Sequence, residues 1–224
     1  MAAVATKTGY GFIDKTGKFI STNRYTQVES FSDGLAAVAE GRWKDSKFGF
    51  INKTGAIAIP LRFDPVQGQM EDMRLSRFTE GLAPVRFGKL YGYIDHKGDT
   101  VIPPTFRDAG QFSEGLASVT TAEGQRGYID KAGLLVIKLS SGTGGQFNEG
   151  LATLTVQING ATKVGYIDPN GKTIIEPKFD AALDFIDGLA EVHFSEKVNS
   201  ASGPATRTGN GYIDRRGRFV WKTE

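Results

Sequence analysis

Six polar residues recur in one short phrase, and their types could support chemistry. Each follows an aromatic residue and an isoleucine and lies three positions before a glycine: Asp14, Asn52, Asp95, Asp130, Asp168 and Asp214. A carboxylate held at a fixed place could act as a general base. Asn52 cannot, but its side chain accepts the same hydrogen bond at the start of a tight turn, where the later glycine tolerates positive φ. The substitution therefore favours a structural turn over catalysis at all six positions.

A second set of acidic residues precedes glycine in phrases such as "FSDGLAAV" (31–38) and "FSEGLASV" (112–119). The set is Asp33, Glu80, Glu114, Glu149 and Asp187. An acidic residue followed by glycine is typical of a turn, and the next residues, "LA", must begin a buried strand. The alternative is a ring of carboxylates around an opening that holds a cation. Cation sites converge several oxygens on one point, so the turn interpretation is favoured.

Other residue types exclude several kinds of site. The chain has no cysteine, and its two histidines, His96 and His193, lie far apart, so neither disulfides nor a His-rich or Cys-rich zinc pattern is expected. The glycine-rich segment "SSGTGGQ" (140–146) lacks the lysine and hydroxyl residue of a nucleotide loop. Without a Ser-His-Asp set or an isolated carboxylate pair, the sequence predicts no enzyme, no cofactor and no metal.

Composition excludes further classes. The 224 residues are 39% hydrophobic and 23% charged, which is typical of a soluble globular protein. The net charge is +2 and the Lys and Arg residues are spread along the chain, so no nucleic-acid partner is expected. No apolar stretch approaches the roughly 18 residues of a membrane span, and no signal peptide is recognisable, so we expect no membrane partner and a cytoplasmic location. A fragment of a secreted protein would read the same way.

The two phrases alternate along the whole chain and define an internal repeat. "MAAV" at 1–4 imitates "LAAV" at 35–38, and units start near residues 1, 35, 82, 116, 151 and 189. A period of this size indicates a propeller, a solenoid or another array. The sequence therefore predicts a single repeat domain over 1–224.

Each unit is expected to consist of short strands. "LAxV", "GYID" and "VIPP" would run up, down and up, so the following segment, such as "TFRDAGQF" (105–112), must cross downward as a fourth strand. Four antiparallel strands describe a small blade, and six units predict a six-bladed β-propeller. The last unit lacks its crossing segment, so the alternatives are a propeller with one incomplete blade and an open, curved β-solenoid.

The alternation of "GYID-x-x-G" with "F-x-E-G-L-A-x-V" resembles the bacterial WG-repeat family over essentially the whole chain. The tryptophan that gives the family its name is missing before each glycine: Tyr10, Phe48, Tyr91, Arg126, Val164 and Asn210 occupy that position. The resemblance implies a β-rich repeat protein without a recognised catalytic apparatus.

The loop between the first two strands varies most between units, and variable loops carry function more often than regular turns. These loops are expected to share one face, which we predict to be the binding face. Its expected contacts are Arg42, Trp43 and Lys44 in the second unit and Lys197 and Arg207 in the last. Trp43 could instead cover an apolar edge of its own blade. Met70 and Met73, in the insertion at 66–77, could form a further adaptable contact.

These features predict a non-enzymatic binding module, a rigid scaffold that presents variable loops to another protein, with a monomer as the default state. The alternative is a lectin-like propeller that binds carbohydrate or another small ligand, although equivalent pockets would need equivalent loops. A hydrolase on a propeller scaffold is a remote alternative, because a fold alone does not exclude catalysis.

Overall fold

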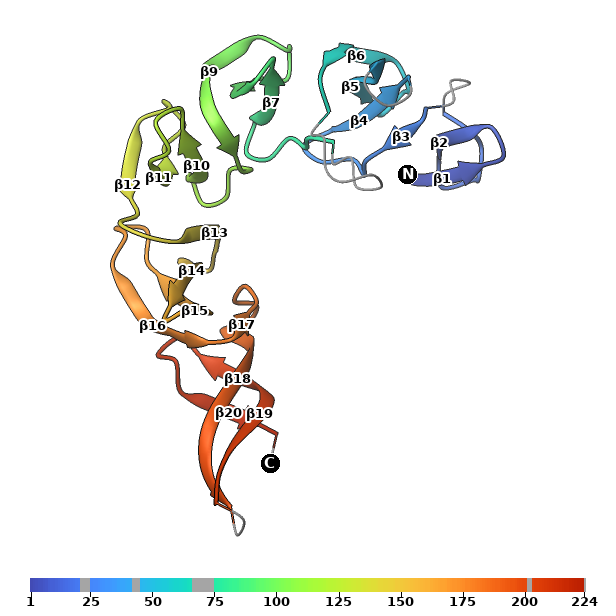
Figure 1. Ribbon diagram of the computed structural model, residues 1–224. Coiled ribbons are helices and arrows are strands. Elements are labelled where there is room, and N and C mark those ends of the chain that lie inside the picture. The colour runs from blue at the N-terminus through green and yellow to red at the C-terminus, as the bar shows by residue number, and fades with distance from the viewer. Residues whose placement is uncertain (21–24, 42–44, 66–74, 201–202, 224) are drawn as a thin grey trace. The chain divides into compact units, whose positions relative to one another are not determined.

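The computed structural model describes residues 1–20, 25–41, 45–65, 75–200 and 203–223. Figure 1 shows that the chain is built from β-strands, which pair in antiparallel sheets and hairpins. The described residues contain no α-helix, which confirms the all-β prediction. In the same ranges no helix is long and apolar enough to cross a membrane.

The chain divides into two compact units. The first comprises Met1–Phe112 and Thr120–Glu123, and the second comprises Ser113–Val119 and Gly124–Glu224. A single repeat domain over 1–224 stays a prediction.

The first unit begins with a two-stranded hairpin of β1 (Ala2–Thr6) and β2 (Gly9–Ile13). A four-stranded sheet follows in the order β3-β4-β5-β6, formed by Gln27–Val28, Leu35–Glu40, Lys47–Asn52 and Ile57–Phe63. Then β7 (Ala83–Phe87), β8 (Leu90–Ile94) and β9 (Thr100–Ala109) pair in sequence. All of these pairings are antiparallel.

The strand β10 (Ala117–Thr121) lies where the two units divide. In the second unit β11 (Arg126–Ile129) pairs with β12 (Leu135–Lys138). Two four-stranded sheets follow, β13-β14-β15-β16 and β17-β18-β19-β20. Their strands are Thr143–Asn148, Leu151–Ile158, Ala161–Ile167 and Thr173–Phe179, and then Ala181–Ala182, Leu189–Ser200, Gly203–Asp214 and Phe219–Lys222.

The "GYID" strand is the central strand of its sheet. Tyr166 and Ile167 point to opposite faces of β15, yet both are buried, and the same holds for Tyr128 and Ile129 in β11. A strand buried on both faces needs apolar residues at successive positions. This explains why the phrase combines an aromatic residue with isoleucine.

The crossing segment begins paired with the central strand of its own repeat, as Phe106 is with Tyr91, but its later part pairs with the repeat that follows. In the three complete four-stranded sheets, β3, β13 and β17 bond to the "LA" strands β4, β14 and β18. The physical reason is the two-residue acid–Gly turn, which folds the crossing segment directly back onto the next strand, as the bridge between Ile186 and Leu189 shows. The expectation that each repeat supplies the fourth strand of its own sheet is therefore corrected. The last sheet has four strands because the repeat before it supplies β17.

Aromatic side chains fill the core between consecutive sheets within each unit. In three central strands a buried tyrosine lies against the phenylalanine that ends the crossing segment. Ring centroids are 5.0 Å apart for Tyr93 and Phe112, 4.9 Å for Tyr128 and Phe147, and 4.9 Å for Tyr166 and Phe185. Distances in this range suit edge-to-face or tilted aromatic contact.

Candidate functional site

The six Asp or Asn residues of the repeated phrase all make the same turn. One side-chain oxygen of each accepts hydrogen bonds from the backbone N–H groups two and four residues later, at 2.8–3.2 Å. The glycine three residues later donates its N–H to the backbone carbonyl of the same residue. Asn52 does this as the aspartates do, so the geometry requires an acceptor oxygen and no charge.

Two of these carboxylates are held in the ionised form by their neighbours. Hydrogen bonds from the Thr16 side chain and backbone lower the pKa of Asp14. The Arg218 side chain lowers the pKa of Asp214 in the same way. A lowered pKa disfavours proton uptake at neutral pH, which is the opposite of what a general base needs.

The acid–Gly pairs are tight turns in which both residues have positive φ, between 47° and 87°. These angles match a type I′ turn, the hairpin connection that suits the twist of two antiparallel strands. The left-handed conformation is tolerated by acidic residues and free for glycine.

Their carboxylates connect one repeat to the next. Glu149 accepts hydrogen bonds from the backbone N–H of Asp187 at 2.6 Å and of Gly188 at 2.9 Å, in the turn that follows it. Asp33 accepts from Gly81 at 2.9 Å, and Glu114 accepts from Gly150 at 2.9 Å. No group of three or more His, Cys, Asp or Glu side chains placed to hold a metal occurs among the described residues. The acidic series thus acts as a row of links between repeats.

The buried tyrosines form a second set of links. Each donates its hydroxyl to a backbone carbonyl 17 residues later: Tyr93 to Gly110 at 2.8 Å, Tyr128 to Gly145 at 2.9 Å, and Tyr166 to Leu183 at 2.7 Å. Burial raises the pKa of all three hydroxyls, so each stays a hydrogen-bond donor.

A third set of links is made by the glycines of the Asp turns, as we call the turns that begin at the repeated Asp or Asn and end at the glycine three residues later. A Cβ placed on Gly171 would lie 2.8 Å from Cγ2 of Ile137, and one on Gly217 would lie 3.0 Å from Cγ2 of Ile175. Gly98 approaches Ile59 in the same way in the first unit, at 2.9 Å. The turn of one repeat therefore docks on the third strand of the repeat before it. Only glycine allows this approach.

Several predicted contact residues lie outside the described part of the chain. Arg42, Trp43 and Lys44 fall in the gap at 42–44, and Met70 and Met73 fall in the gap at 66–74. Their predicted role stays a prediction.

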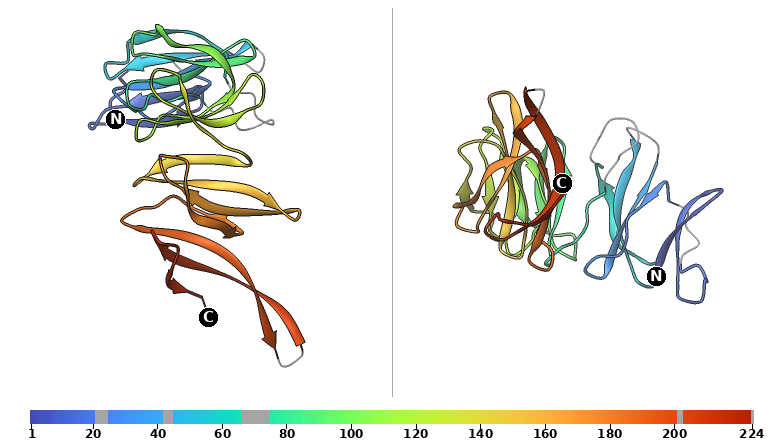
Figure 2. Two further views of the ribbon diagram at one scale, coloured as in Figure 1. Left: turned by 90° about the vertical axis from the view of Figure 1, so that its left-hand side faces the viewer. Right: turned by 90° about the horizontal axis from the view of Figure 1, so that it is seen from below.

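Lys197 and Arg207 lie on opposite strands of a long hairpin, which we call the arm: residues 195–198 of β18 and 203–208 of β19. The sequence was expected to form a loop here. The strands instead continue in register, because residues such as Val198 and Thr206 alternate with polar ones and suit a two-stranded ribbon. In Figure 2 the arm projects beyond β17 and β20.

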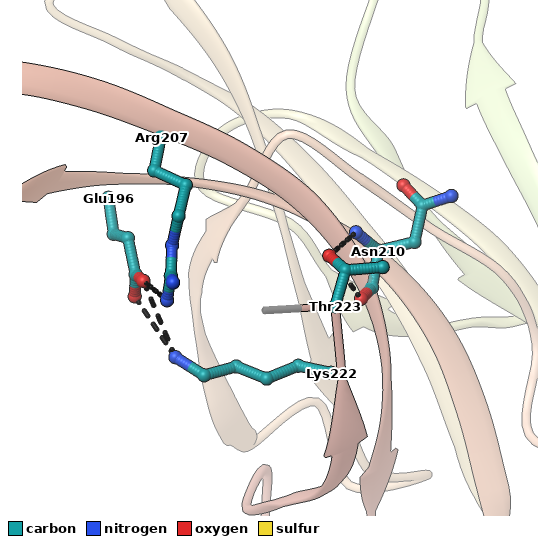
Figure 3. Close-up of polar contacts among 5 residues, drawn as sticks. All are labelled: Glu196, Arg207, Asn210, Lys222 and Thr223. Carbon is teal, nitrogen blue, oxygen red and sulfur yellow. Dashed lines mark hydrogen bonds and ion pairs between the residues drawn. The ribbon is translucent and has the colours of Figure 1, made fainter.

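A charged network braces the base of the arm (Figure 3). The guanidinium of Arg207 pairs with Glu196 directly across the strands, and Lys222 from β20 reaches the same carboxylate at 3.3 Å. The Arg207 hydrogen bond is the main cause that lowers the pKa of Glu196. Arg207 therefore fixes the arm, whereas Lys197 is exposed and has no ion pair with any residue in the described ranges.

The last sheet carries an apolar surface that the sequence did not reveal. We call it the end face: Ile186, Leu189, Tyr212 and Trp221. Tyr212 is 41% exposed and Trp221 is 56% exposed, whereas Tyr166 and Ile175, which occupy the same positions one repeat earlier, are buried. The available signal was a tryptophan where four of the other five repeats have isoleucine.

A small cleft in the first unit is lined by Phe48, Leu75, Val85, Arg86 and Tyr91, among other residues. Its volume is about 160 Å³. Pockets for drug-sized ligands are usually about 300–1,000 Å³, so the cleft offers little room for one.

The chain matches the family model described as "WG containing repeat" at residues 10–41, 48–67, 91–121 and 165–194, together about half of its length. A search of curated proteins finds no match.

Two solved structures are similar at low identity. One is the complex of S. cerevisiae Dbp5 L327V bound to Nup159, Gle1 H337R, IP6 and ADP, with 12% identity over 83% of this chain and 56% of that chain and a TM-score of 0.37. The other is the tricorn protease, with 10% identity over 94% of this chain and 27% of that chain and a TM-score of 0.25. The chain thus spans little more than half of the one and about a quarter of the other.

Proposed function

Because the chain belongs to the family of WG-containing repeat proteins, we propose that it is a non-enzymatic binding module whose rigid β-repeat scaffold presents the arm to a protein partner. The recurring polar residues are already used within the scaffold. The Asp turns, the acid–Gly links and the buried tyrosines all bond to backbone groups. The residues left to meet a partner are those in which the repeats differ.

The observation that carries the proposal is the length of the arm. The strands β18 and β19 each have 12 residues, while the corresponding strands β14 and β15 have 8 and 7. The extra residues of the arm include the exposed Lys197, Pro204 and Thr206 and bury no core of their own. A ribbon that adds nothing to the core, yet is braced at its base by Glu196, is suited to presentation.

Strand pairing also favours a polypeptide partner. The short β17 covers β18 only as far as His193, and β20 covers β19 only as far as Gly211. Beyond these points, within the described residues, both outer edges of the arm lack a paired strand. An extended segment of a partner could add to either edge through main-chain hydrogen bonds. Because the arm is held in place before binding, little conformational entropy would be lost.

Shortening the arm tests the proposal. Residues 197–206 are replaced by Asn-Gly, a two-residue hairpin turn that leaves Glu196 and Arg207 opposite each other. Proteins cross-linked to the shortened and full-length forms in extracts of the native host are compared. We expect the partner to be lost while the melting temperature changes by less than about 2 °C, because the arm adds no core. Full recovery of every partner with the shortened form refutes the proposal.

The matched control keeps the arm intact and changes an exposed residue outside it. Leu134→Ser alters an exposed apolar side chain in the same unit and should leave partner capture unchanged. The lectin-like alternative predicts a different result: binding on a glycan array that survives the shortened arm.

The sequence predicts that the six repeats close into a propeller, with an open, curved array as the alternative. The proposed function depends on the arm and holds for either arrangement.

A further inference from the structure

We infer that the end face binds the Asp14–Lys18 turn of a second copy of this chain, head to tail, and so repeats between molecules the contact that joins repeats within one. The inference rests on the turn contact observed inside the units and on three positions of the end face that are covered or bonded in other repeats but not here.

The first unused position is Trp221. In the register of the central strands it is equivalent to Ile137 and Ile175, and both of those are covered by the turn glycine of the next repeat. Trp221 has no such cover within the described residues and is 56% exposed, with its ring beside that of Tyr212 at 6.3 Å. Trp and Tyr at an exposed, contiguous site are the residues most enriched at binding hot spots.

The second unused position is Leu189, the first residue of its "LA" strand. It is 37% exposed, whereas its equivalents Leu82 and Leu151 are buried. The neighbouring Ile186 is also exposed, at a position where Ser32 and Ser113 donate hydroxyl hydrogen bonds to the following repeat. Ile186 and Leu189 thus expose apolar side chains at positions that are polar or buried in those repeats.

The third unused position is Asp187. Its equivalents Glu114 and Glu149 bind backbone N–H groups of the next turn, but the carboxylate of Asp187 has no partner among the described residues. The carboxylate of Asp187 is therefore available to a positively charged group of a docked copy.

The matching surface is the first Asp turn of the chain. A Cβ placed on Gly17 would meet no atom within 4 Å, while Gly98, Gly171 and Gly217, in equivalent turns, lie against an isoleucine. Of these four turns, the one at Gly17 is therefore unoccupied, and Trp221 is the uncovered position among the third strands compared above. Gly17 has no side chain that would obstruct a close approach, as in the equivalent turns.

Charge fits the same pairing. In the last Asp turn the guanidinium of Arg215 lies over Gly150, 3.3 Å from where a Cβ would be, in the acid–Gly turn of the repeat before it. Lys15 is the equivalent of Arg215 in the first turn. Docked in the same way on the end face, Lys15 would lie over Gly188 and next to the carboxylate of Asp187. A contact between different surfaces of identical chains is heterologous and can continue from copy to copy.

The mass of the 224-residue protein is measured by sedimentation from about 1 to about 200 µM, the range in which a micromolar Kd is resolved. The variant Trp43→Phe leaves Trp221 as the single tryptophan, so its emission reports burial of the end face. We expect the mass to rise with concentration and the emission to shift to the blue in parallel. A monomer at every concentration overturns the inference. So does a monomer whose emission is blue-shifted throughout, because the end face is then covered by its own chain.

Variants identify the contact. Trp221→Glu and Lys15→Glu should each weaken association by about tenfold or more, as loss of a central anchor or reversal of a paired charge does. Leu134→Glu, which changes an exposed apolar residue outside the end face, is the matched control and should associate as the parent does. Lys15→Glu combined with Asp187→Lys restores the opposite charges and should recover association. Equal effects of Trp221→Glu and Leu134→Glu, or no recovery in the double variant, overturn the assignment.

Discussion

The tyrosine links can be measured by one change made at two equivalent positions. Tyr166→Phe removes the hydroxyl that donates to the Leu183 carbonyl at 2.7 Å, while it keeps the ring that lies against Phe185. Tyr212→Phe removes the same hydroxyl one repeat later, where it has no hydrogen-bond partner within the described residues and the ring is exposed. The difference between the two variants isolates the link from the cost of the substitution itself.

The magnitude follows from what is left behind. A net protein hydrogen bond contributes about 0.5–1.5 kcal/mol, and a stranded buried acceptor costs about 1–3 kcal/mol. Leu183 is exposed, so water can reach its carbonyl once the tyrosine hydroxyl is gone. We therefore expect Tyr166→Phe to lower the free energy of unfolding by about 1 kcal/mol and Tyr212→Phe to change it by less than about 0.3 kcal/mol.

Urea unfolding followed by far-ultraviolet circular dichroism provides the assay, with the slope of the transition compared between variants to verify that the same structure unfolds. If the two variants lose the same stability, the hydroxyl link contributes nothing and the reasoning about the buried tyrosines fails.

Three further changes test the remaining links. Glu149→Gln should lower the free energy of unfolding in urea by about 1 kcal/mol, because the amide keeps one acceptor and turns its NH₂ toward an N–H donor. Asp187→Asn should change it hardly at all, because the Asp187 carboxylate has no partner among the described residues, and equal losses in the two variants would contradict the link. Gly171→Ala should cost about 1–3 kcal/mol more than Gly160→Ala, since both glycines have φ near 79° but only the Cβ at Gly171 would strike a side chain, and thermal melts that fail to separate them would show that the docking is loose. The pKa of Asp214 is lowered in the folded protein, so the contribution of its charge to stability is complete above the unfolded pKa of about 3.9 and is lost as the pH falls through the lower folded pKa. The difference in stability between the parent and Asp214→Asn, measured by urea unfolding from pH 7 downward, should therefore shrink in acid. A difference that stays constant would refute this.

The turns could be predicted from the sequence because they depend on residue types within a few positions of each other. Asn52 in place of aspartate and the acid–Gly pairs each point to backbone geometry that a small number of residue types can supply. The central strand was readable for a similar reason, because Tyr166 and Ile167 are both apolar enough to be buried on opposite faces.

The sequence did not predict which repeat the crossing segment pairs with. A repeat period states how often a pattern returns but not which neighbour a strand bonds to, and the two assignments differ by one hairpin. The decisive feature was the length of the acid–Gly turn, such as Glu149–Gly150, because two residues leave no room for the chain to do anything but fold back.

The arm and the end face were missed for a different reason. The region of Lys197 and Arg207 was predicted to be a variable loop, yet cross-strand partners such as Glu196 and Arg207, far apart in the sequence, make a ribbon. Exposure of Trp221 depends on what lies next to it in space, which residue type alone does not state.

The pairing of each crossing strand with the following repeat has a consequence for how such a chain can change in length. Each of the three four-stranded sheets is formed by two neighbouring copies. A cut within one copy and a rejoining at the same point of another therefore restores a complete four-stranded sheet at the junction. Copies can then be gained or lost without a broken core, whereas a single copy excised by itself would leave its own edge bare and its outgoing strand with nothing to bond.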